Sequence, residues 1–491
     1  MKKLLIGLTI VALACSSSIF ANGAQETKAE GSQAESIYVY NSKGENAAQF
    51  AAMCKAYEAE TGIVVKNFSI GSGQDHMETL RAEMNSNEMP TIFSIQGMKE
   101  LPEWEQGGFV QNLSKVTTGD FGKMAQAIPE GLRLSSDGMN SYGVPYNVEG
   151  YGYIADKAML QELFNTDPTA DIQAASYDEW EDFVKTMTAW IANPSAAQVT
   201  LNGTKYTLVA KKGSLSSNLT GVFAVMGSEK WTYGDHFINV AINAVFGSSR
   251  DAANATDAQV AELEGAFRAY AKALDLKTSN LAGADGSAKR GQAFISSAKY
   301  GYDQAVQIFA QSKAMFLKQG NWAFGNIEGV NADMAARLEF LPVKMPFTAN
   351  DVKRTDTTVA KLNSSIPVFV PNYYAVNALV SDSKKQAAYD FLYWLNNSDI
   401  GKNFVVNEFN FIPYNADPAT ITVPNSLGNS IISYIYSDNT LSAPYNGSPA
   451  SWSGDIVGKL VMENYLTKLN WNTADYNTIA DYAVTKWQEM N

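Results

Sequence analysis

The chain has 491 residues, of which 46% are hydrophobic and 18% are charged. At roughly 100–200 residues per domain, this length predicts two to four domains with substantial cores, and the composition excludes a disordered chain. The formal net charge of −13 argues against nucleic acid or an anionic lipid surface as the main partner. Two His and two Cys are too few for a His- or Cys-rich metal site or for a four-cysteine disulfide framework.

The N-terminus predicts export to the periplasm. Met1-Lys2-Lys3 is positively charged and precedes an apolar run, 4–14, that is too short to span a bilayer but suits a secretory signal. Cleavage after Ala21 makes residues 1–21 a signal peptide. In the alternative interpretation, Cys15 becomes the lipidated first residue and anchors the protein. Residues 22–36 are small and polar, which predicts a flexible leader.

The segment after the leader alternates strand and helix patterns. Short apolar runs predict strands over 37–40, 63–68 and 91–95, and apolar residues at helical spacing predict helices over 45–60 and 75–84. This order predicts a mainly parallel sheet with helices on both faces. In such sheets ligands bind beyond the carboxyl ends of the strands, which here carry Asn41-Ser42-Lys43, Gly71-Ser72-Gly73 and Gln96-Gly97.

Local signals set the ends of these helices. Gly62 is a C-cap signal for the first helix, and Asp75 with Glu78 forms a capping box that opens the second. Cys54 lies at helical spacing with apolar neighbours, so we expect a buried structural thiol. Later in the chain, Asn202-Gly203 predicts a hairpin within 199–208, and further helices are expected at 180–190, 256–276, 291–313, 386–396 and 451–469.

Three later segments carry motifs that are weak singly and specific in combination. They are Met89–Ser94 with the following Leu101–Leu113, Tyr142–Ile154, and Ala314–Ile327 with its Gly-Asn-Trp turn. In this order, behind a signal peptide, they resemble the extracellular solute-binding proteins (family 1, carbohydrate type) of ABC transporters, the group that includes maltose-binding protein. The resemblance covers about 37–491, with an apparent insertion near 195–212.

The resemblance implies an α/β, two-lobe periplasmic-binding-protein fold, each lobe a mainly parallel sheet flanked by helices, with hinge strands between. Lobe one is expected to hold 37–148 and 343–412, and lobe two 153–340 and 415–491. The ligand implied is a sugar or small oligosaccharide, which is captured between the lobes and delivered to an inner-membrane permease. A monomer without a cofactor or metal, and without nucleic-acid binding, is expected.

A sugar site needs aromatic faces for stacking and polar groups for the hydroxyls. By resemblance, Trp322 and Trp452 are the expected stacking residues and Glu149 the carboxylate that contacts hydroxyls. Their structural alternatives are an edge-of-core Trp, a helix-start anchor and a hinge salt bridge, respectively.

Further candidates flank the strand ends and the first crossing between lobes. Asn41, Ser94 and Gln96 follow strands, although maltose-binding protein carries a Trp at the place of Ser94. Tyr146, Asn147 and Tyr151 flank the crossing, either as ligand contacts or as hinge packing. We expect a structural or solvent-facing role for each of the two His residues, and core positions for the remaining Trp residues, which are 104, 180, 190, 231, 394, 471 and 487.

The enzyme motifs in the sequence are incomplete, so no catalysis is expected. Ser381–Lys384 and Ser437-Asp438-Asn439 superficially resemble a penicillin-interacting serine enzyme, but the Lys-Thr-Gly strand that this chemistry needs is missing. A secreted glycosidase needs only two opposed carboxylates and stays an alternative. Binding of a non-sugar solute, such as a polyamine or a metal ion, is another.

Overall fold

The computed structural model describes residues 36–71 and 76–491. The predicted signal peptide, Cys15, the leader up to residue 35, and the Ser72-Gly73 and Asp75 predictions lie outside these ranges. Within the described ranges, no helix has both the length and the apolar character needed to cross a bilayer.

The first lobe is built on a mixed sheet with the strand order β2-β1-β3-β14-β4. The predicted parallel pairing is confirmed for β2-β1-β3, whereas β14 and β4 add antiparallel pairs. Because side chains alternate along a strand, Val39 packs into the core on one face and Tyr40 into the core on the other. The strands are β1 (Ile37–Asn41), β2 (Val65–Ser69), β3 (Ile92–Ile95), β4 (Val144–Pro145) and β14 (Tyr373–Val376).

Helices cover this sheet as the sequence predicts. The first helix ends at Gly62, whose φ of 74° is the left-handed conformation that glycine adopts readily. Cys54 is buried, and burial raises the pKa of its thiol to about 12, so it is a structural residue as expected. The helices are α1 (Ala47–Thr61), α2 (His76–Met84), α3 (Leu101–Gln106), α4 (Gly119–Gln126), α18 (Asp382–Asn397) and α19 (Asp399–Asn403).

The second lobe contains a larger mixed sheet with the order β10-β9-β8-β11-β5-β13-β15, in which β12 also pairs with β5. Strand β5 is antiparallel to β11, β12 and β13, whereas β8 is parallel to β9 and β11. The strands are β5 (Glu149–Asp156), β8 (Gly221–Ala224), β9 (Leu281–Ala282), β10 (Ser287–Ala288), β11 (Ala314–Gly320), β12 (Leu338–Leu341), β13 (Ile366–Phe369) and β15 (Thr440–Leu441).

Helices pack around this sheet. They are α5 (Lys157–Phe164), α6 (Thr169–Ala174), α7 (Tyr177–Ala192), α8 (Trp231–Gly234), α9 (His236–Ile242), α10 (Ser249–Ala253), α11 (Asp257–Ala261), α12 (Glu264–Ser279), α13 (Ser297–Tyr300), α14 (Tyr302–Ala310), α15 (Phe324–Glu328), α16 (Ala332–Ala335), α17 (Val359–Ser364), α20 (Ser426–Tyr436) and α21 (Thr473–Met490). The predicted hairpin is confirmed as β6 (Gln198–Leu201) and β7 (Thr204–Thr207), with positive φ at both Asn202 and Gly203.

Three long helices predicted from the sequence are interrupted. The helix expected over 256–276 is divided into α11 and α12. The one expected over 291–313 breaks at Gly301, whose extended backbone caps α14. The one expected over 451–469 forms two π-helical segments, Trp452–Gly458 and Val461–Tyr465.

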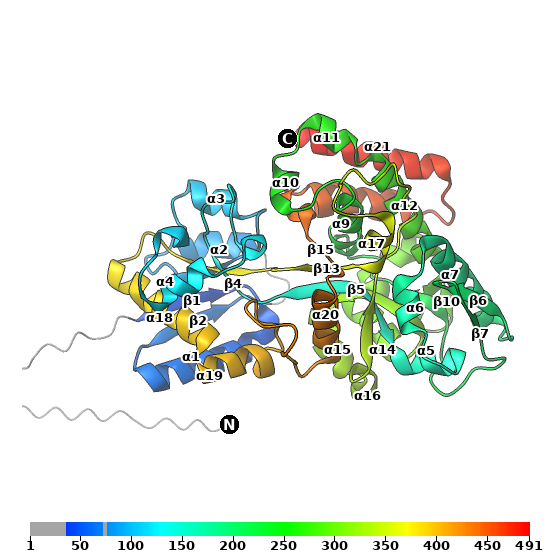
Figure 1. The fold of residues 1–491 in the computed structure, drawn as a ribbon, viewed down its shortest axis with the longest axis horizontal. Coiled ribbons are helices and arrows are strands. Elements are labelled where there is room, and N and C mark those ends of the chain that lie inside the picture. The colour runs from blue at the N-terminus through cyan, green and yellow to red at the C-terminus, as the bar shows by residue number, and fades with distance from the viewer. Residues whose placement is uncertain (1–35, 72–75) are drawn as a thin grey trace, which may run out of the picture. The chain divides into compact units, whose positions relative to one another are not determined.

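Neighbouring chain segments connect the two lobes. Strands β5 and β13 run side by side between the lobes (Figure 1). Phe369 pairs with Glu149, and Val148 forms a bridge with Ile412. Lys344 donates hydrogen bonds to the carbonyl oxygens of Gln173 and Asn363. Residues 343–364 therefore pack on the second lobe, whereas the sequence prediction assigns them to the first, and we propose that this crossing lies at 366–373.

Candidate functional site

A cavity of about 460 Å³ lies where the two lobes and the crossing strands meet. This volume is within the roughly 300–1,000 Å³ of ordinary ligand pockets. Its walls combine aromatic rings with charged and amide side chains. They are Lys43, Gln96 and Lys99 from the first lobe, Glu149, Phe369, Pro371 and Asn372 from the crossings, and Trp231, Asp235, His236, Tyr302, Trp322, Asn326, Tyr445 and Asn446 from the second lobe.

Glu149, the predicted carboxylate, lies at the start of β5 and lines this cavity. Its Oε1 accepts a hydrogen bond from Lys43 Nζ at 2.7 Å and another from Asn147 Nδ2 at 2.9 Å. Its Oε2 accepts none from the described residues. Lys43 and Glu149 are both buried and form an ion pair at this distance. The protein thus fixes one carboxylate oxygen, and the other accepts no hydrogen bond from the described residues.

Trp322 lines the cavity as the resemblance implies, and the sequence around it explains its position. Strand β11 ends at Gly320, and the indole folds back over this glycine so closely that a Cβ there would lie 2.1 Å from a ring atom. The intervening Asn321 accepts a hydrogen bond from the backbone N–H of Gly150 at 3.1 Å. The Gly-Asn-Trp turn therefore places a half-buried indole beside the crossing strand.

His236 is a cavity residue that the sequence prediction missed. Its ring stacks on Tyr151 with centroids 4.4 Å apart, and it lies 5.3 Å from Trp322 and 5.2 Å from Trp231. Burial lowers the pKa of His236 well below its ordinary value, and nearby Lys318 lowers it further, so the imidazole is neutral. Its Nδ1 is buried without a hydrogen-bond partner among the described residues. The structure thus adds His236 to the cavity wall as a buried, not solvent-facing, ring, and it corrects the predicted core position of Trp231.

Asp235 brings a second carboxylate to the cavity, next to His236. Its Oδ1 accepts a hydrogen bond from the Ser453 hydroxyl. Burial raises the pKa of Asp235, and the positive charge of Lys99 opposes this shift. Lys318 lies behind the wall, where its Nζ donates to the Thr232 carbonyl oxygen at 3.1 Å and sits 4.6 Å from the centroid of the Tyr151 ring. Burial holds the pKa of Lys318 well below its usual range.

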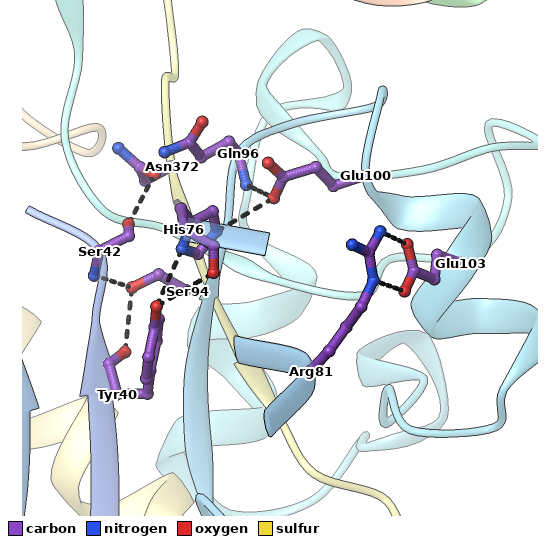
Figure 2. A network of polar contacts seen from close by, with 9 residues as sticks. All are labelled: Tyr40, Ser42, His76, Arg81, Ser94, Gln96, Glu100, Glu103 and Asn372. Atoms are coloured by element: carbon purple, nitrogen blue, oxygen red, sulfur yellow. Dashed lines mark hydrogen bonds and ion pairs between the residues drawn. The ribbon is translucent and has the colours of Figure 1, made fainter. Parts of the chain in front are cut away.

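A polar network fixes the strand ends of the first lobe next to the cavity, and Figure 2 shows it. Ser94 Oγ donates to the Tyr40 carbonyl oxygen at 3.1 Å and accepts from the Ser42 N–H at 3.3 Å. Ser42 Oγ in turn donates to Asn372 Oδ1 at 3.0 Å, and the Gln96 N–H donates to Glu100 at 2.7 Å. Among these residues, Gln96 and Asn372 line the cavity, whereas Ser94 is fully buried and holds two strand ends together.

The remaining first-lobe and crossing candidates pack beneath the wall. Asn41 is buried and accepts a hydrogen bond from the Tyr146 hydroxyl at 2.9 Å, and the Tyr146 ring stacks on Tyr374. Asn147 is buried beside Glu149, and Tyr151 is covered by His236. None of these four lines the cavity. The three crossing residues are thus buried side chains that pack at the crossing between the lobes.

Trp452 does not lie in the cavity, which corrects its predicted role as a stacking residue. It is fully buried, its indole N–H donates to the Ala483 carbonyl oxygen at 2.8 Å, and its ring centroid lies 4.6 Å from that of Trp487. The large apolar area of the indole is thus buried in the core against α21. Tyr445, a few residues earlier in the turn Pro444–Gly447, lines the cavity instead.

The two sheets, the crossing strands and the cavity between them define a two-lobe binding protein. A family model for bacterial extracellular solute-binding proteins matches residues 52–423. The chain therefore belongs to the bacterial extracellular solute-binding protein family. No curated protein matches the chain at the sequence level.

Solved structures share this fold at low sequence identity. RafE from Streptococcus pneumoniae in its apo form gives a TM-score of 0.58 at 15% identity, covering 94% of this chain and 98% of RafE, and RafE has also been solved with raffinose. The GacH receptor of Streptomyces glaucescens, solved unliganded and with acarbose, gives 0.59 at 13% identity, covering 93% and 98%. A family 1 extracellular solute-binding protein from Bifidobacterium longum subsp. infantis gives 0.57 at 15%, covering 94% and 100%.

Proposed function

We propose that this chain captures a neutral sugar or small oligosaccharide in the cavity between its lobes. The observation that carries the proposal is the pairing of aromatic rings with polar atoms that have no partner among the described residues. Trp322 and Trp231 offer half-buried ring faces, while Glu149 Oε2 and the buried His236 Nδ1 accept no hydrogen bond from the described residues. A sugar presents both weakly apolar C–H faces and hydroxyls, so it satisfies both kinds of group.

The charges at the cavity support a neutral ligand over a polyamine. Glu149 is neutralised by Lys43 at 2.7 Å. The positive charge of Lys99, also on the cavity wall, acts against the burial that raises the pKa of Asp235. A polycation needs an excess of unpaired carboxylates, and the described residues that line this cavity do not supply one. A metal ion is also disfavoured, because no group of three or more His, Cys, Asp or Glu within 36–71 and 76–491 is arranged to hold one.

The role in transport rests on the family and on its structural relatives. Two proteins of the same fold, RafE and GacH, have been solved with raffinose and acarbose. We infer that the exported chain binds without catalysis and delivers its sugar to the permease of an ABC importer. Closure of the two lobes over the ligand would accompany capture.

Isothermal titration calorimetry of the protein from Asn22 onward tests this proposal. The panel contains glucose, galactose, maltose, melibiose, raffinose and chitobiose, with spermidine as the charged comparison. Saturable binding of a sugar, recovered intact by chromatography, supports the proposal. Binding of spermidine alone contradicts the ligand class. Recovery of cleaved sugar contradicts the binding role and supports a glycosidase instead.

A further inference from the structure

A second, smaller cavity of about 300 Å³ adjoins the sugar cavity. Both cavities are lined by Phe369 and Asn446, so they are neighbours along the gap between the lobes. We call the smaller cavity the side compartment. Its walls come from the first lobe (Glu130 to Arg133), from the second lobe (Ser248 to Arg250) and from the crossing segment Val368 to Val370.

An interlobe contact closes the side compartment. Arg250 Nη1 of the second lobe lies 3.7 Å from Glu130 Oε1 of the first lobe. The guanidinium also packs on Gly138, where a Cβ would lie 1.8 Å from Nη1. Both side chains remain partly exposed, at 45% for Arg250 and 70% for Glu130, so the pair is open to other hydrogen-bond partners. A solvent-exposed pair of this kind contributes little by itself to stability.

The chemistry of the side compartment suits a hydroxyl-rich group. Glu130 and Arg250 form an ion pair across it, and serine hydroxyls and the Asn446 amide lie on its walls. Arg133 also lines it, with its guanidinium donating to the backbone carbonyl oxygens of Ile128 and Gln126. Val368, Val370 and Tyr373 supply an apolar side. Its volume is at the lower end of the range of ligand pockets, which excludes a long chain but admits one more ring next to the first.

We propose that the side compartment holds a second sugar ring, so that the ligand of this protein is an oligosaccharide of at least two units. The first ring occupies the aromatic cavity, and the linkage passes Phe369 and Asn446. Arg250 then determines the preferred chain length, because its guanidinium donates hydrogen bonds to the second ring. This inference rests on the proposed function and adds to it the size of the ligand.

Calorimetry with three length series tests the inference. The series are glucose, maltose and maltotriose; galactose, melibiose and raffinose; and N-acetylglucosamine, chitobiose and chitotriose. The variants are Arg250→Ala and Gly131→Phe, since Gly131 lines the side compartment and a Cβ there meets no atom within 4 Å. The matched control is Arg268→Ala, an arginine of similar exposure, 43%, on α12. Thermal unfolding verifies that each variant is folded.

The expected result is that the wild type binds a disaccharide or trisaccharide of one series more tightly than its monosaccharide. Arg250→Ala should lower the affinity for the longer ligand by roughly tenfold, as expected for the loss of a hydrogen bond to a charged group. The affinity for the monosaccharide should stay unchanged. Gly131→Phe should likewise lower the affinity for the longer ligand and not for the monosaccharide. Arg268→Ala should change neither affinity. Equal losses for all lengths would make Arg250 a lobe-closure contact and overturn the inference. Equal affinity for all lengths in the wild type would overturn it as well. If no sugar of any length binds, the proposed function itself fails.

Discussion

Lys43 and Glu149, which are 106 residues apart in the chain, form a buried ion pair of 2.7 Å in the wall of the cavity. Lys43 follows the first strand of lobe one, and Glu149 begins the strand that crosses to lobe two. Their side chains are 8% and 5% exposed. The pair therefore connects a strand end of the first lobe to the crossing, and under the proposed function the other carboxylate oxygen of Glu149 accepts a hydrogen bond from the sugar.

Replacing Glu149 tests its contribution to stability and its contribution to sugar binding. In Glu149→Gln, the buried ion pair between Lys43 and Glu149 is broken, and breaking such a pair costs up to about 3–5 kcal/mol of unfolding free energy. The variant also loses a charged acceptor, so we expect at least roughly tenfold weaker sugar binding. Urea unfolding and calorimetry measure the two effects.

The double variant Lys43→Met/Glu149→Gln separates the effect on stability from the effect on sugar binding. Replacing both partners of the ion pair costs less than breaking it from one side, so most of the lost stability should return. Affinity should stay low because the ligand still lacks its carboxylate. Recovery of affinity together with stability would contradict a direct contact between Glu149 and the sugar.

Two tryptophans should respond in opposite ways to replacement by alanine. Trp322→Ala removes a half-buried ring from the cavity, and we expect a loss of about 2–3 kcal/mol in binding with a small effect on stability. Trp452→Ala empties a fully buried position and should cost about 3–5 kcal/mol in unfolding free energy. Its folded fraction should bind sugar normally. Weak sugar binding by the folded fraction of Trp452→Ala would contradict the core role and indicate that Trp452 contributes to the site.

The buried imidazole of His236 leads to a prediction about how sugar affinity and stability depend on pH. Since burial keeps the pKa of His236 well below 6.5, the imidazole stays neutral and sugar affinity should be constant between pH 8 and pH 6. Stability should behave differently. The unfolded chain takes up a proton on His236 below about pH 6.5 and the folded chain does not, so this residue lowers the unfolding free energy as the pH falls below that value. Calorimetry across pH, with His236→Phe as the variant that keeps the ring, measures both. A midpoint in affinity near pH 6.5 that disappears in His236→Phe would show that the imidazole is protonated in the folded state.

Lys277 gives a stability prediction in the alkaline range. Burial on α12 lowers the pKa of its amine to about 7, and the Nζ lies 5.0 Å from the centroid of the Phe237 ring. In the unfolded chain the amine binds a proton up to about pH 10.4. The folded state therefore gains relative stability from this residue as the pH rises from 7 toward 10, by on the order of 1 kcal/mol per pH unit at most.

Lys277→Met removes this titration. The stabilising effect of the substitution should thus be larger at pH 7 than at pH 9, as measured by urea unfolding at both values. Lys205→Met, at an exposed position on β7, serves as the control and should show no such difference. A stability difference between wild type and Lys277→Met that is independent of pH would contradict a neutral buried amine.

The sequence predicts the first lobe well because its signals are local. The alternation of strands and helices over 37–95 predicts the parallel order β2-β1-β3, and glycine at position 62 ends α1. The insertion of β14 between β3 and β4 depends on pairing between residues about 230–280 positions apart, which no local pattern encodes. The same applies to residues 343–364, whose side chains pack on the second lobe.

In the candidate site, too, the residues positioned by local contacts could be predicted and those positioned by long-range contacts could not. Glu149 and Trp322 follow from motifs, since each is positioned by its immediate neighbours, Asn147 and Gly320. Trp231 and His236 occur on two short helices without a motif, and the fold alone brings them to Trp322. Trp452 shows the converse, since a tryptophan near a helix start can be either a stacking residue or a core residue. The contact with Trp487, 35 residues later in the chain, shows that Trp452 is a core residue.

The most direct test of the central claim is a calorimetric titration of the wild type, Trp322→Ala and Glu149→Gln with the sugar panel under identical conditions. The account predicts saturable binding of at least one neutral sugar by the wild type. It also predicts at least tenfold weaker binding in each variant, with the sugar recovered intact. Unchanged affinity in both folded variants would contradict the account, because the sugar would then bind elsewhere than in the cavity formed by Trp322 and Glu149.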